Sequence, residues 1–257
     1  MAYIGTKDYF TEVSMGRVAN TNAVNKFGYN LDVDTGSEQI IASFGGTFLP
    51  SVNVINTALA FKITYTNTLD GSTATGARSL IITYIDASQN EVTAIHTLGS
   101  TGTDTTAFTG FGVNRAVVYS NGGLGWNGGD IRILNNAATT IQASIPATKS
   151  VTQQALYHVG IGRTFLMRQL NINILKISGG SSPVVTVRGY SWSRVTSTRY
   201  QVYRKEIDTG VENSILDDFD GDAIKFTGRE IIYFTAETNT NNTVVNLRFS
   251  GLDTITT

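Results

Sequence analysis

The sequence predicts an all-β protein of two tandem antiparallel β-sandwich domains, jelly-roll-like in pattern, that follow an extended N-terminal arm. Three observations lead to this fold class. The 257 residues include 26 Gly but only 3 Pro, and with abundant Thr and Asn they are typical of many short strands joined by polar turns. Apolar and polar residues alternate repeatedly from about residue 38 to the end. Few windows show the apolar spacing of an amphipathic helix.

The domain boundaries follow from where the alternation begins and pauses. Residues 1–28 mix Gly, Asn and small residues without periodicity, which is typical of an extended arm. Residues 29–148 contain a first set of alternating segments and predict the first sandwich. The polar stretch around Pro146 separates this set from a second one, so residues 149–257 predict the second sandwich. The segments that carry the two sets include "ALAFKITYTN", "SLIITYIDAS", "TFLMRQLNINILKI" and "PVVTVRGYSW".

The final alternating segment of the chain, residues 243–252, predicts both a burial pattern and a pairing. In "TVVNLRFSGL", Val245, Leu247 and Phe249 alternate with Asn246 and Arg248, so the first three are expected in the core and the other two outside. Because a polar Asn/Thr turn joins this segment to an apolar run just before it, we expect the two to form a hairpin that covers an open sheet edge.

Composition limits the functions that the chain can have. The formal net charge is −1 and the pI about 6.1, so no excess of basic residues predicts binding to nucleic acid or an anionic membrane. There is no Cys and there are only 2 His, which leaves little material for thiolate metal sites or catalytic triads. We see neither a leader peptide nor a membrane-spanning segment. We therefore expect no enzyme activity, no catalytic residues and no cofactor.

One carboxylate cluster remains open to two interpretations. Residues 217–222, "DDFDGD", place four acids around a Gly, and clustered oxygens can hold Ca²⁺. The stretch lacks the downstream Glu of a helix-loop-helix calcium site. A solvated acidic loop is the alternative, and we predict no metal site.

Candidate interface residues come from three stretches. Only 15% of the residues are charged, below the usual quarter, which indicates that much of the surface contacts other protein. Aromatic residues of the arm, a Trp within the Gly-rich stretch 121–130, and a mixture of Arg and aromatics after residue 187 supply the residue types enriched in interfaces. The candidates are Tyr3, Tyr9, Phe10, Trp126, Arg188, Tyr190, Trp192, Tyr200 and Tyr203.

Several stretches resemble a family of tailed-bacteriophage virion proteins common in marine phages. In the first half they are "TATGARSLIITYIDASQNEVTAIHTLGST" and "FGVNRAVVYSNGG" followed by "GDIRI"; in the second they are "ALYHVGIGRTFLMRQL", "VVTVRGYSWSR" and "GREIIYFTAETNTNNTVVNLRFSGL". The resemblance covers roughly residues 35–255. It departs at "GIGR", residues 160–163, where the family has a Pro-Gly turn. It implies a structural or capsid-associated role and no catalytic residue.

The expected function is that of a virion structural protein, assembled in the host cytoplasm and located on the capsid surface. Within this class we favour a decoration or cement protein that acts as a symmetric oligomer, with a trimer favoured. Its partners would be the major capsid protein and neighbouring virion proteins, with no nucleic acid or membrane. The alternatives are a head-fibre or tail component, and a carbohydrate-binding jelly roll whose groove would use Trp126, Trp192 and Tyr203.

Overall fold

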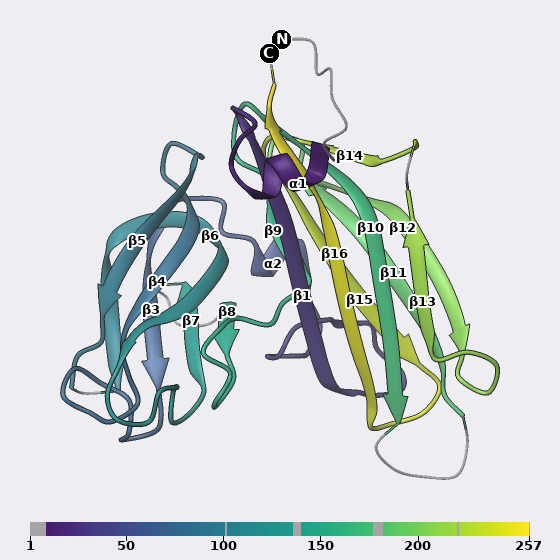
Figure 1. The fold of residues 1–257 in the computed structure, drawn as a ribbon. Coiled ribbons are helices and arrows are strands. Elements are labelled where there is room, and N and C mark those ends of the chain that lie inside the picture. Colours follow the sequence, from purple (N-terminus) through teal and green to yellow (C-terminus); the bar gives the residue numbers. More distant parts are fainter. Residues whose placement is uncertain (1–8, 101, 136–139, 177–181, 220, 257) are drawn as a thin grey trace.

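The chain is almost entirely antiparallel β-structure, which confirms the all-β prediction (Figure 1). The computed structural model describes residues 9–100, 102–135, 140–176, 182–219 and 221–256. In these ranges two short helices occur, α1 (Tyr9–Ser14) and α2 (Pro50–Asn53). The strands form two units, named below the sandwich unit and the half-barrel unit.

The sandwich unit consists of two sheets. The front sheet has the order β1-β16-β10-β13, with β14 also paired to β10; the back sheet has the order β12-β11-β15-β2, with β9 also paired to β15. Phe165, Phe234 and Phe249 are fully buried between the sheets. The strands are β1 (Thr21–Val33), β2 (Gln39–Ile40), β9 (Leu156–His158), β10 (Arg163–Lys176), β11 (Val184–Ser193), β12 (Thr198–Asp208), β13 (Ser214–Asp218), β14 (Ile224–Thr227), β15 (Glu230–Thr238) and β16 (Thr243–Ile255).

The half-barrel unit is one six-stranded sheet, β5-β4-β6-β3-β7-β8, that curls around its own core (Figure 1). After β8 the chain returns to β6, where the Val118 amide donates to Ser150 O at 2.9 Å and the Thr152 amide donates to Ala116 O at 3.0 Å. These bonds attach the segment after β8 to the second half of β6, a strand inside the sheet. The strands are β3 (Leu59–Tyr65), β4 (Ala77–Asp86), β5 (Glu91–Thr97), β6 (Thr103–Asn121), β7 (Ile131–Asn135) and β8 (Ile141–Ile145).

The N-terminal stretch differs from the predicted arm over its described part. Residues 21–28 belong to β1, which pairs along its length with β16, more than 200 residues later. Gly28 is required on this strand, because a Cβ there would lie 2.3 Å from Ile41 O. The prediction failed because the Asn- and Gly-containing sequence of β1 lacks a clear alternation. Residues 1–8 lie outside the described residues.

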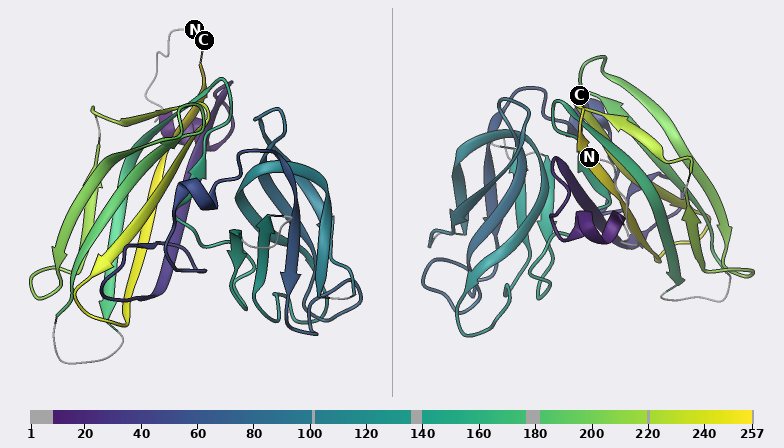
Figure 2. Two further views of the ribbon diagram at one scale, coloured as in Figure 1. Left: turned by 180° about the vertical axis from the view of Figure 1, so that it is seen from behind. Right: turned by 45° about the horizontal axis from the view of Figure 1, so that its top comes forward.

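The predicted first sandwich, residues 29–148, is divided between the two units. Its first part supplies β1 and β2 to the sheets of the sandwich unit, and its remainder from β3 to β8 forms the half-barrel. The chain leaves the sandwich after Ala42 and returns at Gln154, and these two residues pair with each other. The half-barrel is thus inserted into the sandwich, and α2 lies between the two units (Figure 2).

The predicted C-terminal hairpin is wrong in its pairing but correct in its burial. β15 pairs with β11, β9 and β2 in the back sheet, whereas β16 pairs with β1 and β10 in the front sheet. The intervening turn therefore crosses from one sheet to the other, and β16 is a central strand with no edge to cover. Val245, Leu247 and Phe249 are fully buried, whereas Asn246 is half-buried and Arg248 exposed, as predicted.

Candidate functional site

Three of the predicted interface residues, Arg188, Tyr190 and Trp192, lie on the outer face of the back sheet. Glu38 lies at the centre: it accepts a hydrogen bond from Tyr190 Oη at 3.1 Å and one from Thr235 Oγ1 at 2.7 Å. Arg188 Nη1 lies 3.6 Å from Glu38 and 2.8 Å from a carboxylate oxygen of Glu237. Burial, with the nearby Glu38 charge, raises the pKa of Tyr190. The Arg and Tyr side chains of this stretch thus have partners within the chain.

Trp192 is covered by the chain's own residues. It is 8% exposed and packs with Tyr190, Tyr233 and Phe48 in a separate core beneath the segment around α2. Residues 44–54 therefore cover part of the stretch that was predicted as an exposed Arg-aromatic surface. No local sequence signal indicates this packing.

The other candidates are dispersed. Tyr203 donates from its hydroxyl to Asp217 on the front sheet, and burial followed by this bond raises the pKa of the phenol. Tyr200 is 51% exposed on β12, and Trp126 is 46% exposed on a loop of the half-barrel. The carbohydrate groove predicted from Trp126, Trp192 and Tyr203 is not assembled, because these residues lie in different units or within the core.

The aromatic residues at the start of the chain dock on the sandwich unit. Tyr9 and Phe10 are in edge contact, with ring centroids 5.6 Å apart, and the Arg168 guanidinium lies 3.6 Å from the Phe10 ring centroid. This contact places α1 against β10 of the front sheet. Tyr3 lies outside the described residues.

The acidic stretch 217–222 shows no metal site in its described part. Asp217 binds the Tyr203 hydroxyl and lies 4.0 Å from Lys205 Nζ. Across the described parts of the chain, no group of three or more His, Cys, Asp or Glu side chains could hold a metal ion. Asp220 falls outside these parts.

The half-barrel presents an apolar row on its outer face, named below the apolar row. Its members are Val151, Val117, Ile81 and Ile95, which pair successively across neighbouring strands. Ile95 is 54% exposed on the edge strand β5, and Tyr119, two residues after Val117 on β6, is 60% exposed. A hydrophobic row that ends at an edge strand is a surface suited to protein contact.

The sequence contains a signal for this row. Alternation in "SLIITYIDAS" assigns Leu80 and Ile82 to the core, and both are fully buried. Ile81 then faces outward, where a polar residue is expected on a solvent-exposed face. An apolar residue at an outward-facing position of the alternation thus indicates the apolar row.

A buried polar network joins the two units, named below the junction. Lys26 Nζ of β1 donates to Asn114 O of β6, and the Asn114 amide donates to the carboxylate of Glu91 and, at 2.9 Å, to His158 O. Burial lowers the pKa of Lys26 to about 7 and raises that of Glu91. Asn114 therefore connects strands of both units through polar and ionisable groups. Burying such groups is costly unless they form hydrogen bonds, as these do.

The second half of the junction is built on His158. Arg194 Nη2 lies 2.7 Å from His158 Nδ1, and because a guanidinium only donates, Nδ1 must accept. Burial, then the Arg194 charge, lowers the pKa of His158 well below its usual value, so the imidazole is neutral. The ring packs against Gly112, where a Cβ would lie 2.3 Å from Cε1. These contacts give the junction a structural role.

Comparisons with known proteins leave the family open. No family model and no curated protein matches the chain. Among solved structures, T=1 particles derived from infectious bursal virus align at 8% identity over 92% of this chain and 78% of that one, with a TM-score of 0.14. A VP2 subviral particle of infectious bursal disease virus aligns at 10% identity over 91% and 81%, with a TM-score of 0.13. Scores this low do not establish a shared fold. No helix in the described ranges has the length and apolar character needed to cross a membrane.

Proposed function

We propose that this protein is a structural component of a tailed-bacteriophage virion. Within that class we propose a decoration or cement protein that binds the outside of the capsid as a symmetric oligomer, with a trimer favoured, and carries out no catalysis. The observation that carries the proposal is the apolar row, which crosses the half-barrel from Val151 to Ile95 and ends at an edge strand. The sequence resemblance and the low content of charged residues support it.

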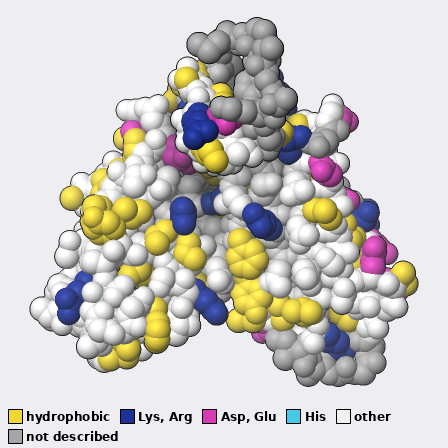
Figure 3. All heavy atoms as spheres, in the orientation of Figure 1, with side chains coloured by type: hydrophobic (Ala, Val, Ile, Leu, Met, Phe, Trp, Pro, Cys, Tyr) yellow, Lys and Arg dark blue, Asp and Glu magenta, His cyan; other side chains and the backbone are white. Residues whose placement is uncertain are grey.

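The apolar row fits a contact that is repeated around a symmetry axis. β-Branched side chains on a sheet are already restricted in rotation, so covering them costs little additional entropy. Their burial stabilises by roughly 25 cal/mol for each Å² removed from water. On the face that Figure 3 shows, hydrophobic side chains lie in several patches over both units, with Lys, Arg, Asp and Glu side chains scattered between them. A stable interface would bury about 1,000 Å² or more.

The test is Ile95→Asp, which places a charge in the apolar row at an exposed position. Its control is Val211→Asp, an apolar-to-acid change at a residue of the sandwich unit that is 85% exposed. We expect Ile95→Asp to weaken oligomerisation, measured by light scattering, or co-sedimentation with capsids that lack the protein, by at least tenfold. The control should behave as wild type, and both variants should keep the wild-type melting temperature.

Wild-type assembly and capsid binding by Ile95→Asp would refute the proposal that the apolar row is the contact. The same assay distinguishes the alternatives within the virion. A protein that co-sediments with purified tails and not with capsids would be a tail component, and the decoration role would be wrong.

A further inference from the structure

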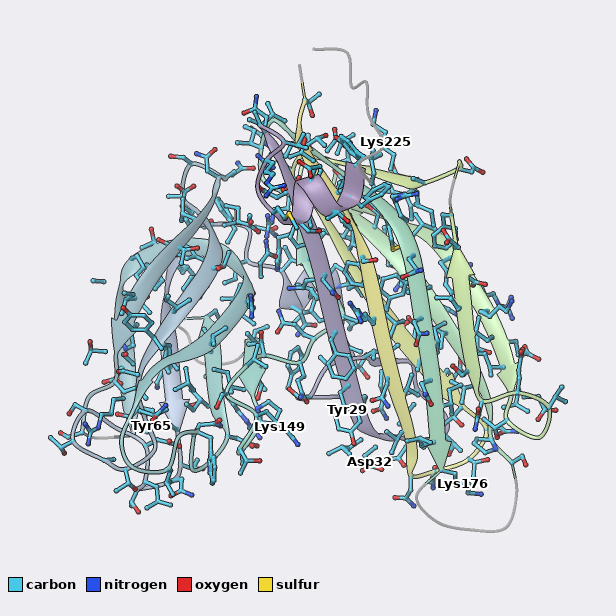
Figure 4. All side chains as sticks on the ribbon, in the orientation of Figure 1. Tyr29, Asp32, Tyr65, Lys149, Lys176 and Lys225 are labelled. Atoms are coloured by element: carbon cyan, nitrogen blue, oxygen red, sulfur yellow. The ribbon has the colours of Figure 1, made fainter. Side chains whose placement is uncertain are left out.

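The outer face of the front sheet carries amide and aromatic side chains in register across three strands, named below the amide face. One row consists of Phe27, Arg248 and Asn171, and the next of Tyr29, Asn246 and Asn173. Because their neighbours along β16 point into the core, these six side chains point away from it. Figure 4 shows Tyr29 on β1 and Lys176 at the end of β10 in the same sheet.

The two aromatic rings lie next to each other at the edge of this face. Phe27 and Tyr29 are two residues apart on β1, so they share a side of the strand. Their ring centroids are 6.4 Å apart and their planes are within 16° of parallel. Phe27 is 43% exposed, in a cross-strand row whose other two side chains are polar. Two near-parallel rings offer flat apolar area to a ligand that has a flat apolar face of its own.

A pocket of about 370 Å³ continues the amide face toward α1. It is lined by Asn25, Gln169 and Ser250 from the next cross-strand row, and by Phe10 and Arg168 where α1 docks. The lining therefore combines amides, a hydroxyl and an aromatic ring. A volume of this order suits a small polar group such as one or two sugar rings.

The hydrogen-bonding groups on this surface are mostly neutral and act both as donors and as acceptors. A side-chain amide offers two N–H donors and a carbonyl acceptor. Arg248 Nε donates to Asn25 Oδ1 at 2.9 Å, which fixes the guanidinium on the face. The amide face thus presents side-chain amides beside a guanidinium that is held in position.

This chemistry distinguishes between classes of ligand. A nucleic acid would need several cations along the face. The two cross-strand rows contain one cation, Arg248, and at the pocket Arg168 is accompanied by Asp218. In the core of a protein interface, each of these amides would need a hydrogen-bond partner on the other protein, and each amide left without one would weaken binding. Each sugar hydroxyl is both a donor and an acceptor, and the C–H face of a pyranose ring packs on an aromatic ring.

We infer that the amide face binds a neutral oligosaccharide, with sugar rings stacked on Phe27 and Tyr29 and hydroxyls bonded to the Asn side chains. The inference does not depend on the proposed virion role, because the amide face lies on the sandwich unit and the apolar row on the half-barrel. Its residues also differ from those from which the sequence predicted a carbohydrate groove.

The experiment is a glycan microarray followed by calorimetric titration with neutral hexasaccharides of glucose and mannose, with a heparin hexasaccharide as the anionic comparison. The variants are Phe27→Ala and Asn173→Ala, and the control is Tyr200→Ala, an aromatic that is 51% exposed on the back sheet. We expect a neutral glycan to bind, each amide-face variant to weaken binding at least tenfold, and the control to bind as wild type. Unchanged melting temperatures would show that the variants remain folded.

Three results would overturn the inference: no neutral glycan binds, binding survives Phe27→Ala, or only the anionic hexasaccharide binds. If no glycan binds and Phe27→Ala changes the oligomeric state, the amide face is a protein contact. Ile95→Asp should leave glycan binding unchanged, so failure of this inference is distinguishable from failure of the virion proposal.

Discussion

Replacing Lys26 with Met should change how the stability of the protein depends on pH. Burial lowers the pKa of this lysine from 10.5 to about 7. At about 1.4 kcal/mol for each pH unit, the difference corresponds to at most about 5 kcal/mol. Between pH 7 and 10.5 the unfolded chain binds a proton at Lys26 that the folded chain does not. The free energy of unfolding should therefore rise with pH in this window.

The assay is urea unfolding of wild type, Lys26→Met and Lys149→Met at several pH values from 7 to 9.5. Near pH 7 Lys26→Met removes the cost of burying a charge but leaves Asn114 O without its donor, so the two effects partly cancel. By pH 9.5 only the second effect remains, so the variant should lose a few kcal/mol relative to wild type across the window. Lys149 is exposed, and its variant should follow wild type. Parallel curves for wild type and Lys26→Met would refute the assigned burial.

Four further perturbations test the sandwich unit. Phe249→Ala should cost about 3–5 kcal/mol through a cavity, and Asn246→Ala under about 0.5 kcal/mol; the reverse order in urea melts would place the wrong face of β16 in the core. A chain that starts at Leu31 lacks most of β1, so it should lose the cooperative melt of the intact protein, and a wild-type melting temperature would contradict the pairing of β1 with β16. Arg163 Nε lies 2.6 Å from the Asp253 carboxylate, so Arg163→Met should cost about 3–5 kcal/mol at pH 7. The loss should shrink toward pH 4, where the carboxyl can take up a proton, and an equal loss at both pH values would contradict a buried ion pair.

Side-chain burial could be predicted from the sequence because it follows from neighbours along the chain. In "FKITY" the alternation assigns Phe61, Ile63 and Tyr65 to one face, and all three are buried. The same rule placed the alternate residues of β16 correctly. Such patterns depend only on the two-residue period of a strand.

Strand pairing could not be predicted in this way. β1 pairs with β16, and β15 and β16 separate into different sheets although only a short turn joins them. Alternation along one strand carries no information about which distant strand lies beside it. The error about the arm and the error about the hairpin have this common cause.

The candidate site was predictable only in part, for a related reason. Arg188 and Tyr190 have the residue types of an interface, but Glu38, which binds both, precedes them by 150 residues or more. The amide face likewise combines β1, β10 and β16, none of which shows by itself that its outward residues meet in rows. Sites of this kind exist only once the register is known.

The point at which the half-barrel is inserted allows the two units to change separately. Ala42 and Gln154 lie side by side, so the chain departs from the sandwich and rejoins it at the same place. A replacement loop needs only to span neighbouring residues, and no strand of the sandwich has to move when the inserted unit is exchanged, enlarged or removed. The junction would have to be rebuilt, since Asn114 and Glu91 come from the insert, and so would the cover of Trp192 by the segment around α2. In a gene with this arrangement, two breakpoints near codons 42 and 154 are enough to exchange the inserted unit while the strands of the sandwich are kept.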